Sequence, residues 1–236
     1  MSFLVEVVAW FGDRANWRGS SGLVQLTWEH VTISVVAMLI AMAVALPLGL
    51  MLGHLGRGGV VAINVSNVGR AVPSFAVLVF ALQLSSIGTT PTLVALVVLA
   101  VPPMVTNSYV GVREVDGDMK ESARGMGMTG RQVFLGVELP VALPLVMAGV
   151  RTAAVQVVAT ATLAALVGYG GLGALIVLGL RTGDNVEVFA GALAVAVLAL
   201  VAEMGLGLAQ RALTSDRGRD RPDPAERADA VVPRPV

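Results

Sequence analysis

The sequence predicts an all-α polytopic membrane protein with about five transmembrane helices. The chain of 236 residues is 56% hydrophobic and only 14% charged, and its mean hydropathy is +0.80. Together with several long apolar runs, this composition is typical of a membrane protein rather than a globular one. The formal net charge is zero and there is no cysteine, so neither a disulfide framework nor a thiolate metal site is expected. We expect a single transmembrane domain that contacts membrane lipid and no nucleic acid.

Five segments are long and apolar enough to be spans, because crossing the hydrocarbon core takes about 20 mostly apolar residues. Lipid offers the backbone no hydrogen-bond partner, so each span is expected to be helical and an open sheet is excluded. The predicted spans are residues 31–52, 60–82, 92–110, 141–167 and 188–208.

The regions that flank the spans predict an interfacial start and a solvated end. The chain opens MSFLVEVVAWFGDR, without the cationic start of a cleaved signal peptide, so the N-terminus is expected to be retained. Residues 1–23 are expected to form an interfacial segment, since the apolar stretch before Asp13 is too short to span. Residues 24–213 are expected to form the transmembrane domain. Residues 214–236 alternate Arg with acidic residues and contain four prolines, which predicts a disordered cytoplasmic tail.

Basic residues predict the orientation of the bundle, because loops with an excess of Lys and Arg face the cytoplasm. The turn after the first span, the connection between the third and fourth spans, and the C-terminal tail are all basic and lie on one side. The other side has Arg14, Arg18 and Arg181. We expect a multi-pass protein of the cell membrane with its N-terminus outside and its C-terminus in the cytoplasm. The basic residues assigned to the cytoplasmic side are Arg57, Arg113, Lys120, Arg124, Arg131, Arg211, Arg217, Arg219, Arg221, Arg227 and Arg234.

Residues 121–140, ESARGMGMTGRQVFLGVELP, are far more polar than the spans on either side. They carry two acidic residues, two arginines and four glycines. The pattern predicts a short amphipathic helix over residues 118–126, a break at residues 128–130 and a second helix over residues 131–137. Glycine removes a side chain where another surface comes close, so we expect the segment to dock against a partner outside the lipid.

The spacing within this segment resembles the EAA loop of ATP-binding-cassette (ABC) importer permeases. Glu121-Ser122-Ala123 is followed after three residues by Gly127 and, after nine more, by Val137-Glu138-Leu139-Pro140, with Ser for the usual second Ala and Val for the usual Ile. Residues 117–140 are therefore termed the EAA-like segment. The resemblance implies a type I (MetI-like) permease fold whose coupling helices contact an ATPase subunit through Glu121, Ala123 and Gly127. The wider set of coupling residues is Glu121, Ser122, Ala123, Gly125, Gly127, Val137, Leu139 and Pro140.

The resemblance extends to VPSFAVL after Arg70 and to residues 137–153 and 159–173, which are similar to the osmoprotectant branch of these permeases. That branch imports glycine betaine, choline, carnitine or proline. A methionine permease is the alternative within the family, because methionine permeases are similar around residues 67–73. A passive channel or membrane scaffold without an ATPase is the alternative from another class. A membrane enzyme is disfavoured, because the spans show no metal-ligand cluster and no nucleophile–base pair.

The partners that we expect follow from what the chain lacks and from the resemblance. It has no GxxxxGK[ST] phosphate loop, and Lys120 is its single lysine, so we expect no catalytic residue, metal or cofactor in this chain. The resemblance implies that a partner ATPase binds ATP and Mg²⁺, and that an extracytoplasmic substrate-binding protein delivers the solute. A second permease copy or a paralogue would complete the path. Aromatic residues make up only 5% of the chain, so a cation–π cage for a quaternary ammonium group is expected in the binding protein.

Charged residues inside spans cost roughly 2.5–3.5 kcal/mol at mid-helix, so Arg70, Arg151 and Glu203 need explanations. Each either extends to the headgroups or pairs within the bundle, and Arg70 and Arg151 are also candidates for a gate. Pro73, beside Arg70, loosens its helix because proline has no N–H to donate.

The other polar side chains of the spans predict either a path or helix contacts. Thr152, Gln156 and Thr160 recur every four residues and share one helical face, which could line the translocation path or bond neighbouring helices. His30 and His54 stand alone and are expected to be structural or interfacial.

The stretch VGYGGLG at residues 167–173 contains GxGxxG, the pattern of a dinucleotide-binding turn. It follows a membrane helix and has no βαβ unit around it, so nucleotide binding is rejected. We expect a tight outer turn, where the resemblance suggests docking of the binding protein. Its glycines are Gly168, Gly170, Gly171 and Gly173.

Overall fold

The computed structural model describes residues 2–59, 63–64, 67, 69, 71–84 and 88–214, and the regular secondary structure of these residues is entirely helical. This confirms the all-α prediction. In chain order the elements are α1 (Phe3–Gly12), η1 (Arg14–Trp17), α2 (Leu23–Leu55), α4 (Ser74–Leu84), α5 (Thr89–Arg113), α6 (Gly117–Gly125), α7 (Gly130–Val133), η2 (Phe134–Glu138), α8 (Leu139–Ala161), η3 (Thr162–Val167), α9 (Gly173–Thr182) and α10 (Asn185–Thr214).

Four helical stretches in the described part of the chain are long and apolar enough to cross a membrane. They contain four of the five predicted spans and extend beyond each of them, because the helices continue past the apolar core of each span. Of the remaining span, residues 60–82, the structure has α4 at the C-terminal end, and residues 60–62, 65–66, 68 and 70 lie outside the described residues. The four stretches are Leu23–Leu55, Thr89–Arg113, Gly130–Val167 and Asn185–Leu213.

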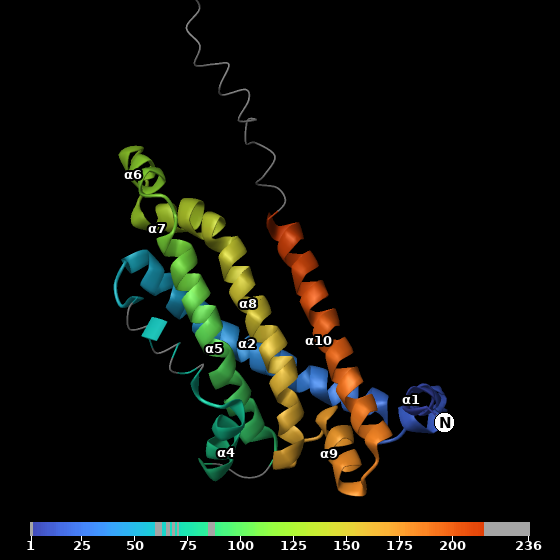
Figure 1. Cartoon of the computed structure of the whole chain (residues 1–236). Coiled ribbons are helices and arrows are strands. Elements are labelled where there is room, and N and C mark those ends of the chain that lie inside the picture. The colour runs from blue at the N-terminus through green and yellow to red at the C-terminus, as the bar shows by residue number, and fades with distance from the viewer. Residues whose placement is uncertain are drawn as a thin grey trace, which may run out of the picture.

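The core of the bundle lies where α2 packs against α5 and α8 (Figure 1). Small side chains form much of it, since Ala37, Ala41, Ala45, Ala100 and Ala153 are fully buried. Membrane helices use small residues in this way because their backbones can then pack closely, with dispersion forces and polar contacts holding them together.

Two glycines of α2 show how close that packing is. A Cβ atom at Gly49 would lie 2.7 Å from the carbonyl oxygen of Val105, and one at Gly53 would lie 2.7 Å from Cβ of Val112. Both glycines face α5, and any side chain at either position would push the two helices apart.

The two ends of the bundle hold different parts of the chain. α6, α7 and the C-terminal end of α10 lie at one end, and α1, α4 and α9 lie at the other (Figure 1). The EAA-like segment and the end of the last span are therefore on the same side, opposite the N-terminal segment.

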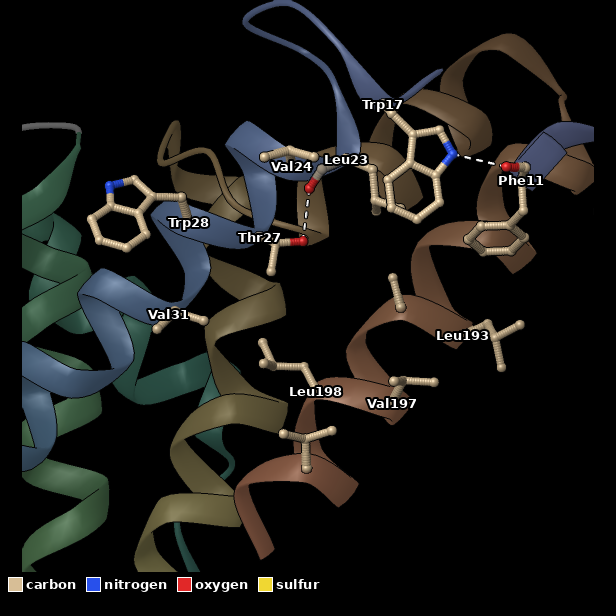
Figure 2. A pocket seen from close by; sticks show the side chains of 12 residues that line it. Phe11, Trp17, Leu23, Val24, Thr27, Trp28, Val31, Leu193, Val197 and Leu198 are labelled. Carbon is tan, nitrogen blue, oxygen red and sulfur yellow. Dashed lines mark hydrogen bonds between the residues drawn. The ribbon is translucent and has the colours of Figure 1, made fainter. Parts of the chain in front are cut away.

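The N-terminal segment, α2 and α10 together line an apolar groove of about 660 Å³ (Figure 2). Trp17 and Trp28 border it, and its threonine, Thr27, already donates its hydroxyl to the Leu23 carbonyl at 2.7 Å. The indole N–H of Trp17 donates to the Phe11 carbonyl at 2.8 Å. The lining of the groove is almost entirely apolar, so it suits hydrocarbon rather than a charged solute.

Candidate functional site

Polar side chains cap helix α6 and anchor it to α5. The Asp116 carboxylate accepts the N–H of Asp118 at 2.9 Å, which caps the helix. The ammonium group of Lys120 donates to the Val112 carbonyl at 3.3 Å, and Ala123 is only 2% exposed. The Lys120 bond ties α6 to the end of α5, and α6 packs mainly on α7 and η2, so its other side faces outward.

The turn after α6 depends on Gly127, whose φ of +85° is a conformation that favours glycine. Its N–H donates to the Arg124 carbonyl at 2.9 Å, and the N–H of Met128 donates to the Ala123 carbonyl at 3.1 Å. These bonds satisfy carbonyls that the end of the helix leaves open. The predicted break before the second helix thus begins at Gly127.

The second helix, α7, starts with a capping box between Thr129 and Gln132. Residues 131–137 are helical as predicted, but the α-helical part ends at Val133 and the helical pitch changes at Phe134. There the chain forms a π-turn, η2, in which the Leu139 N–H donates to the Phe134 carbonyl. Pro140 has no N–H, and a wider turn before it relieves the clash of its ring with the carbonyl four residues earlier. The segment therefore continues directly into α8.

Exposure divides the predicted coupling residues into an outer and an inner set. Ala123 is buried inside the segment, so its position does not support the expected ATPase contact. Met126, 77% exposed, was missed by the sequence analysis, and so was the half-exposed Met119. Methionine forms adaptable apolar contacts, so a methionine among the polar and glycine residues of this segment could have indicated a docking residue. Glu121, Ser122, Gly125 and Gly127 are exposed, and Val137, Leu139 and Pro140 are partly buried.

A hydrogen bond between side chains joins the base of the segment to α2. Glu138 is 2% exposed, and its Oε2 lies 2.5 Å from Nδ1 of His54, in the last turn of α2. The His54 ring packs on Phe134 with ring centroids 5.1 Å apart. Glu138 is not among the predicted coupling residues, although a carboxylate next to an apolar run could have pointed to it.

One charged residue of α8, Arg151, pairs with one of α10, Glu203. The Arg151 guanidinium contacts the Glu203 carboxylate and donates to Oε1 of Gln210 at 2.9 Å, and Gln210 donates to the Pro144 carbonyl at 3.2 Å. Pairing within the bundle thus accounts for Arg151 and Glu203. Arg70 lies outside the described residues.

Pro73 is exposed and directly precedes α4, where its carbonyl accepts the N–H of Val77 at 3.2 Å. Pro73 therefore lies just before the start of a helix. The expectation that it loosens a continuous helix is wrong, because the chain has a break between helical segments at this position.

The polar face of α8 borders a groove of about 780 Å³ between α8 and α10. Arg151, Thr152 and Glu203 line this α8–α10 groove, and the Thr152 hydroxyl donates to the Ala148 carbonyl at 3.0 Å. Gln156 and Thr160 are partly exposed and follow on the same helix, about one and two turns further along. The structure thus places Thr152 beside the ion pair; the role of the stripe in a path stays a prediction.

The glycine turn, residues 168–173, is held at the opposite end of the molecule by Glu29 of α2. The carboxylate of Glu29 accepts the Gly171 N–H at 3.0 Å, and the Tyr169 hydroxyl donates to the Glu29 carbonyl at 3.1 Å. Burial, together with the nearby Glu29 charge, raises the pKa of Tyr169, which keeps this hydroxyl a donor.

Each glycine of this turn occupies a position that a larger residue would not fit without strain or a clash. Gly168 and Gly171 have φ values of +81° and +76°. A Cβ atom at Gly170 would collide with the Glu29 carboxylate, and one at Gly173 would collide with the Thr162 carbonyl, at 2.1 and 2.0 Å. The turn is therefore closely built against α2 and η3.

Comparison with known proteins places this geometry in a family. Residues 45–215 match the family described as binding-protein-dependent transport system inner membrane component. The chain is 39% identical over 192 residues to the choline transport system permease protein OpuBB of Bacillus subtilis (strain 168), covering 81% of this chain and 88% of the relative. It is 42% identical over 196 residues to the carnitine transport permease protein OpuCB of Listeria monocytogenes, covering 83% and 89%.

Solved structures show the same fold. An inward-facing structure of the MetNI methionine ABC transporter aligns with a TM-score of 0.70 at 24% identity, over 81% of this chain and 96% of that one. This likeness confirms the MetI-like fold, and the sequence matches confirm the predicted resemblance. This chain belongs to the family of binding-protein-dependent transport system inner membrane components.

Proposed function

We propose that the chain is the permease subunit of an ATP-driven importer of compatible solutes, such as glycine betaine, choline, carnitine or proline. The observation that carries the proposal is its identity of 39% and 42%, over more than four fifths of the chain, to permeases named for choline and carnitine transport. The likeness to the methionine transporter is weaker in sequence and supports the fold alone. A methionine cargo therefore remains the less favoured alternative.

The proposed arrangement puts the EAA-like segment in the cytoplasm, bound to the ATPase. Basic residues support this orientation, since Arg113, Lys120, Arg124 and Arg131 lie at or near the end that holds α6 and α7. The exposed Glu121 and Met126 would give the docking surface a charge and an apolar contact. ATP and Mg²⁺ would bind to the ATPase alone.

The proposed transport cycle needs a second permease, either a copy or a paralogue, and a binding protein at the end that holds the glycine turn. Closure of two ATPase subunits on ATP would push both EAA-like segments and turn the permeases from inward-open to outward-open. The binding protein would then release its solute into the path. A passive channel would need none of these partners.

Uptake by the purified complex tests this function. The chain, with the ATPase that co-purifies with it and its binding protein, is placed in liposomes, and labelled choline, glycine betaine and methionine are offered with and without ATP inside. We expect ATP-dependent uptake of choline or glycine betaine and none of methionine. Methionine uptake would move the chain to the alternative cargo, and uptake without ATP or ATPase would show a passive channel.

A further inference from the structure

A histidine joins the EAA-like segment to a span that is not its neighbour in the chain. α5 leads into the segment and α8 follows it directly, so both move with it through the backbone. α2 comes earlier in the chain and meets the segment at His54, whose Nδ1 lies 2.5 Å from the Glu138 carboxylate. Since Glu138 is 2% exposed, losing this partner would leave a buried carboxylate poorly satisfied.

Three positions of the segment face the His54 ring. Gly130, Phe134 and Glu138 recur every four residues and so lie on one side of α7 and the π-turn. Phe134 packs on the ring, and a Cβ atom at Gly130 would lie 4.0 Å from Nε2. His54, Phe134 and Arg131 border a cleft of about 500 Å³. The segment therefore contacts His54 through more than the single bond to Glu138.

α2 carries this contact to the other end of the bundle. Its glycines at 49 and 53 pack directly on α5, which makes the two helices a closely fitted pair. At the other end of α2, Glu29 accepts the Gly171 N–H of the glycine turn. Between Glu29 and His54 the helix rises about 37 Å, at 1.5 Å per residue. One continuous helix thus contacts the EAA-like segment and the glycine turn.

We propose that His54 and Glu138 form a clamp that passes movement of the EAA-like segment to α2, and along α2 to the glycine turn. His54 is then a positioning residue for energy coupling. This inference rests on the proposed function, because it assigns the clamp to communication between the ATPase end and the binding-protein end. Hydrolysis by the ATPase itself does not require the clamp.

The test separates coupling from assembly in the complex reconstituted with its ATPase. His54→Phe keeps a ring on Phe134 but loses the bond to Glu138, and Glu138→Gln keeps the shape but loses the charge. Met51→Leu is the matched control, since Met51 is exposed on the same helix and borders the same cleft. We expect basal ATP hydrolysis and co-purification to be unchanged in all three variants. Stimulation by solute-loaded binding protein and uptake of labelled choline or glycine betaine should fall roughly tenfold in the two clamp variants only.

Pair replacements make the result specific. The exchanged pair, His54→Glu with Glu138→His, should recover stimulation, whereas the apolar pair, His54→Phe with Glu138→Leu, should recover thermal stability without stimulation. Normal stimulation in His54→Phe would overturn the proposal. A parallel loss of basal hydrolysis and assembly would also overturn it, because the pair would then only hold the fold. If the unaltered complex shows no ATP-dependent uptake, the proposed function itself fails, and the clamp fails with it.

Discussion

Single residues of the EAA-like segment either hold its shape or form its outer surface. Ala123 is buried, so a larger side chain would have no room, and Gly127 is fixed by its positive φ. Glu121 and Met126 are exposed and make little contact within the chain that would dictate their identity. The motif therefore combines positions required by the fold of the segment with positions available to a partner.

Gly127→Ala should destabilise the end of α6 by about 1 kcal/mol, because an L-residue is strained at a positive φ. No atom lies within 4 Å of the added Cβ, so the strain is in the backbone alone. Hydrogen exchange at the Met128 amide, which donates to the Ala123 carbonyl, should become faster.

The matched control for this variant is Gly125→Ala. Gly125 is also free of neighbours within 4 Å, but it is helical, and alanine is the better helix former. Exchange at Met128 should therefore stay the same or slow down. Equal exchange rates in the two variants would contradict the role given to the Gly127 conformation.

The helices show which features a sequence pattern can predict. Span length and apolar composition identified α2, α5, α8 and α10, because lipid imposes these two properties on any membrane helix. The π-turn was not predicted, since hydrophobic periodicity does not distinguish a bond four residues back from one five back. The Glu138 contact with His54 was not predicted either, because the two residues are 84 positions apart and meet only through packing.

The ion pair between α8 and α10 should contribute about 1 kcal/mol, a typical size for polar contacts between membrane helices. Glu203→Gln should lower thermal stability in detergent by that amount, because Arg151 would keep its place in the α8–α10 groove without a charged partner. The exchanged pair, Arg151→Glu with Glu203→Arg, should recover most of the loss. Unchanged thermal stability in Glu203→Gln would show that the pair does not hold these helices together.

At the scale of the whole molecule, the proposed ATPase and the proposed binding protein would each meet one end of the bundle. The EAA-like segment and the glycine turn lie at opposite ends of the bundle, and α2 contacts both (Figure 1). The sequence identified both segments, because their spacing and glycine content differ from those of the spans. It did not reveal that the same helix joins them, which depends on the crossing of α2 over α5 and α8.

Thiol labelling at Met126 tests most directly whether the EAA-like segment is a cytoplasmic docking surface for an ATPase. The chain has no cysteine, so Met126→Cys introduces a single thiol at a position that is 77% exposed. A membrane-impermeant maleimide should label it in inside-out vesicles but not in right-side-out ones, and bound ATPase should reduce the labelling. Arg18→Cys, at the opposite end, should show the reverse sidedness and no protection. Labelling of Met126→Cys from the outside, or labelling that the ATPase does not change, would contradict the account.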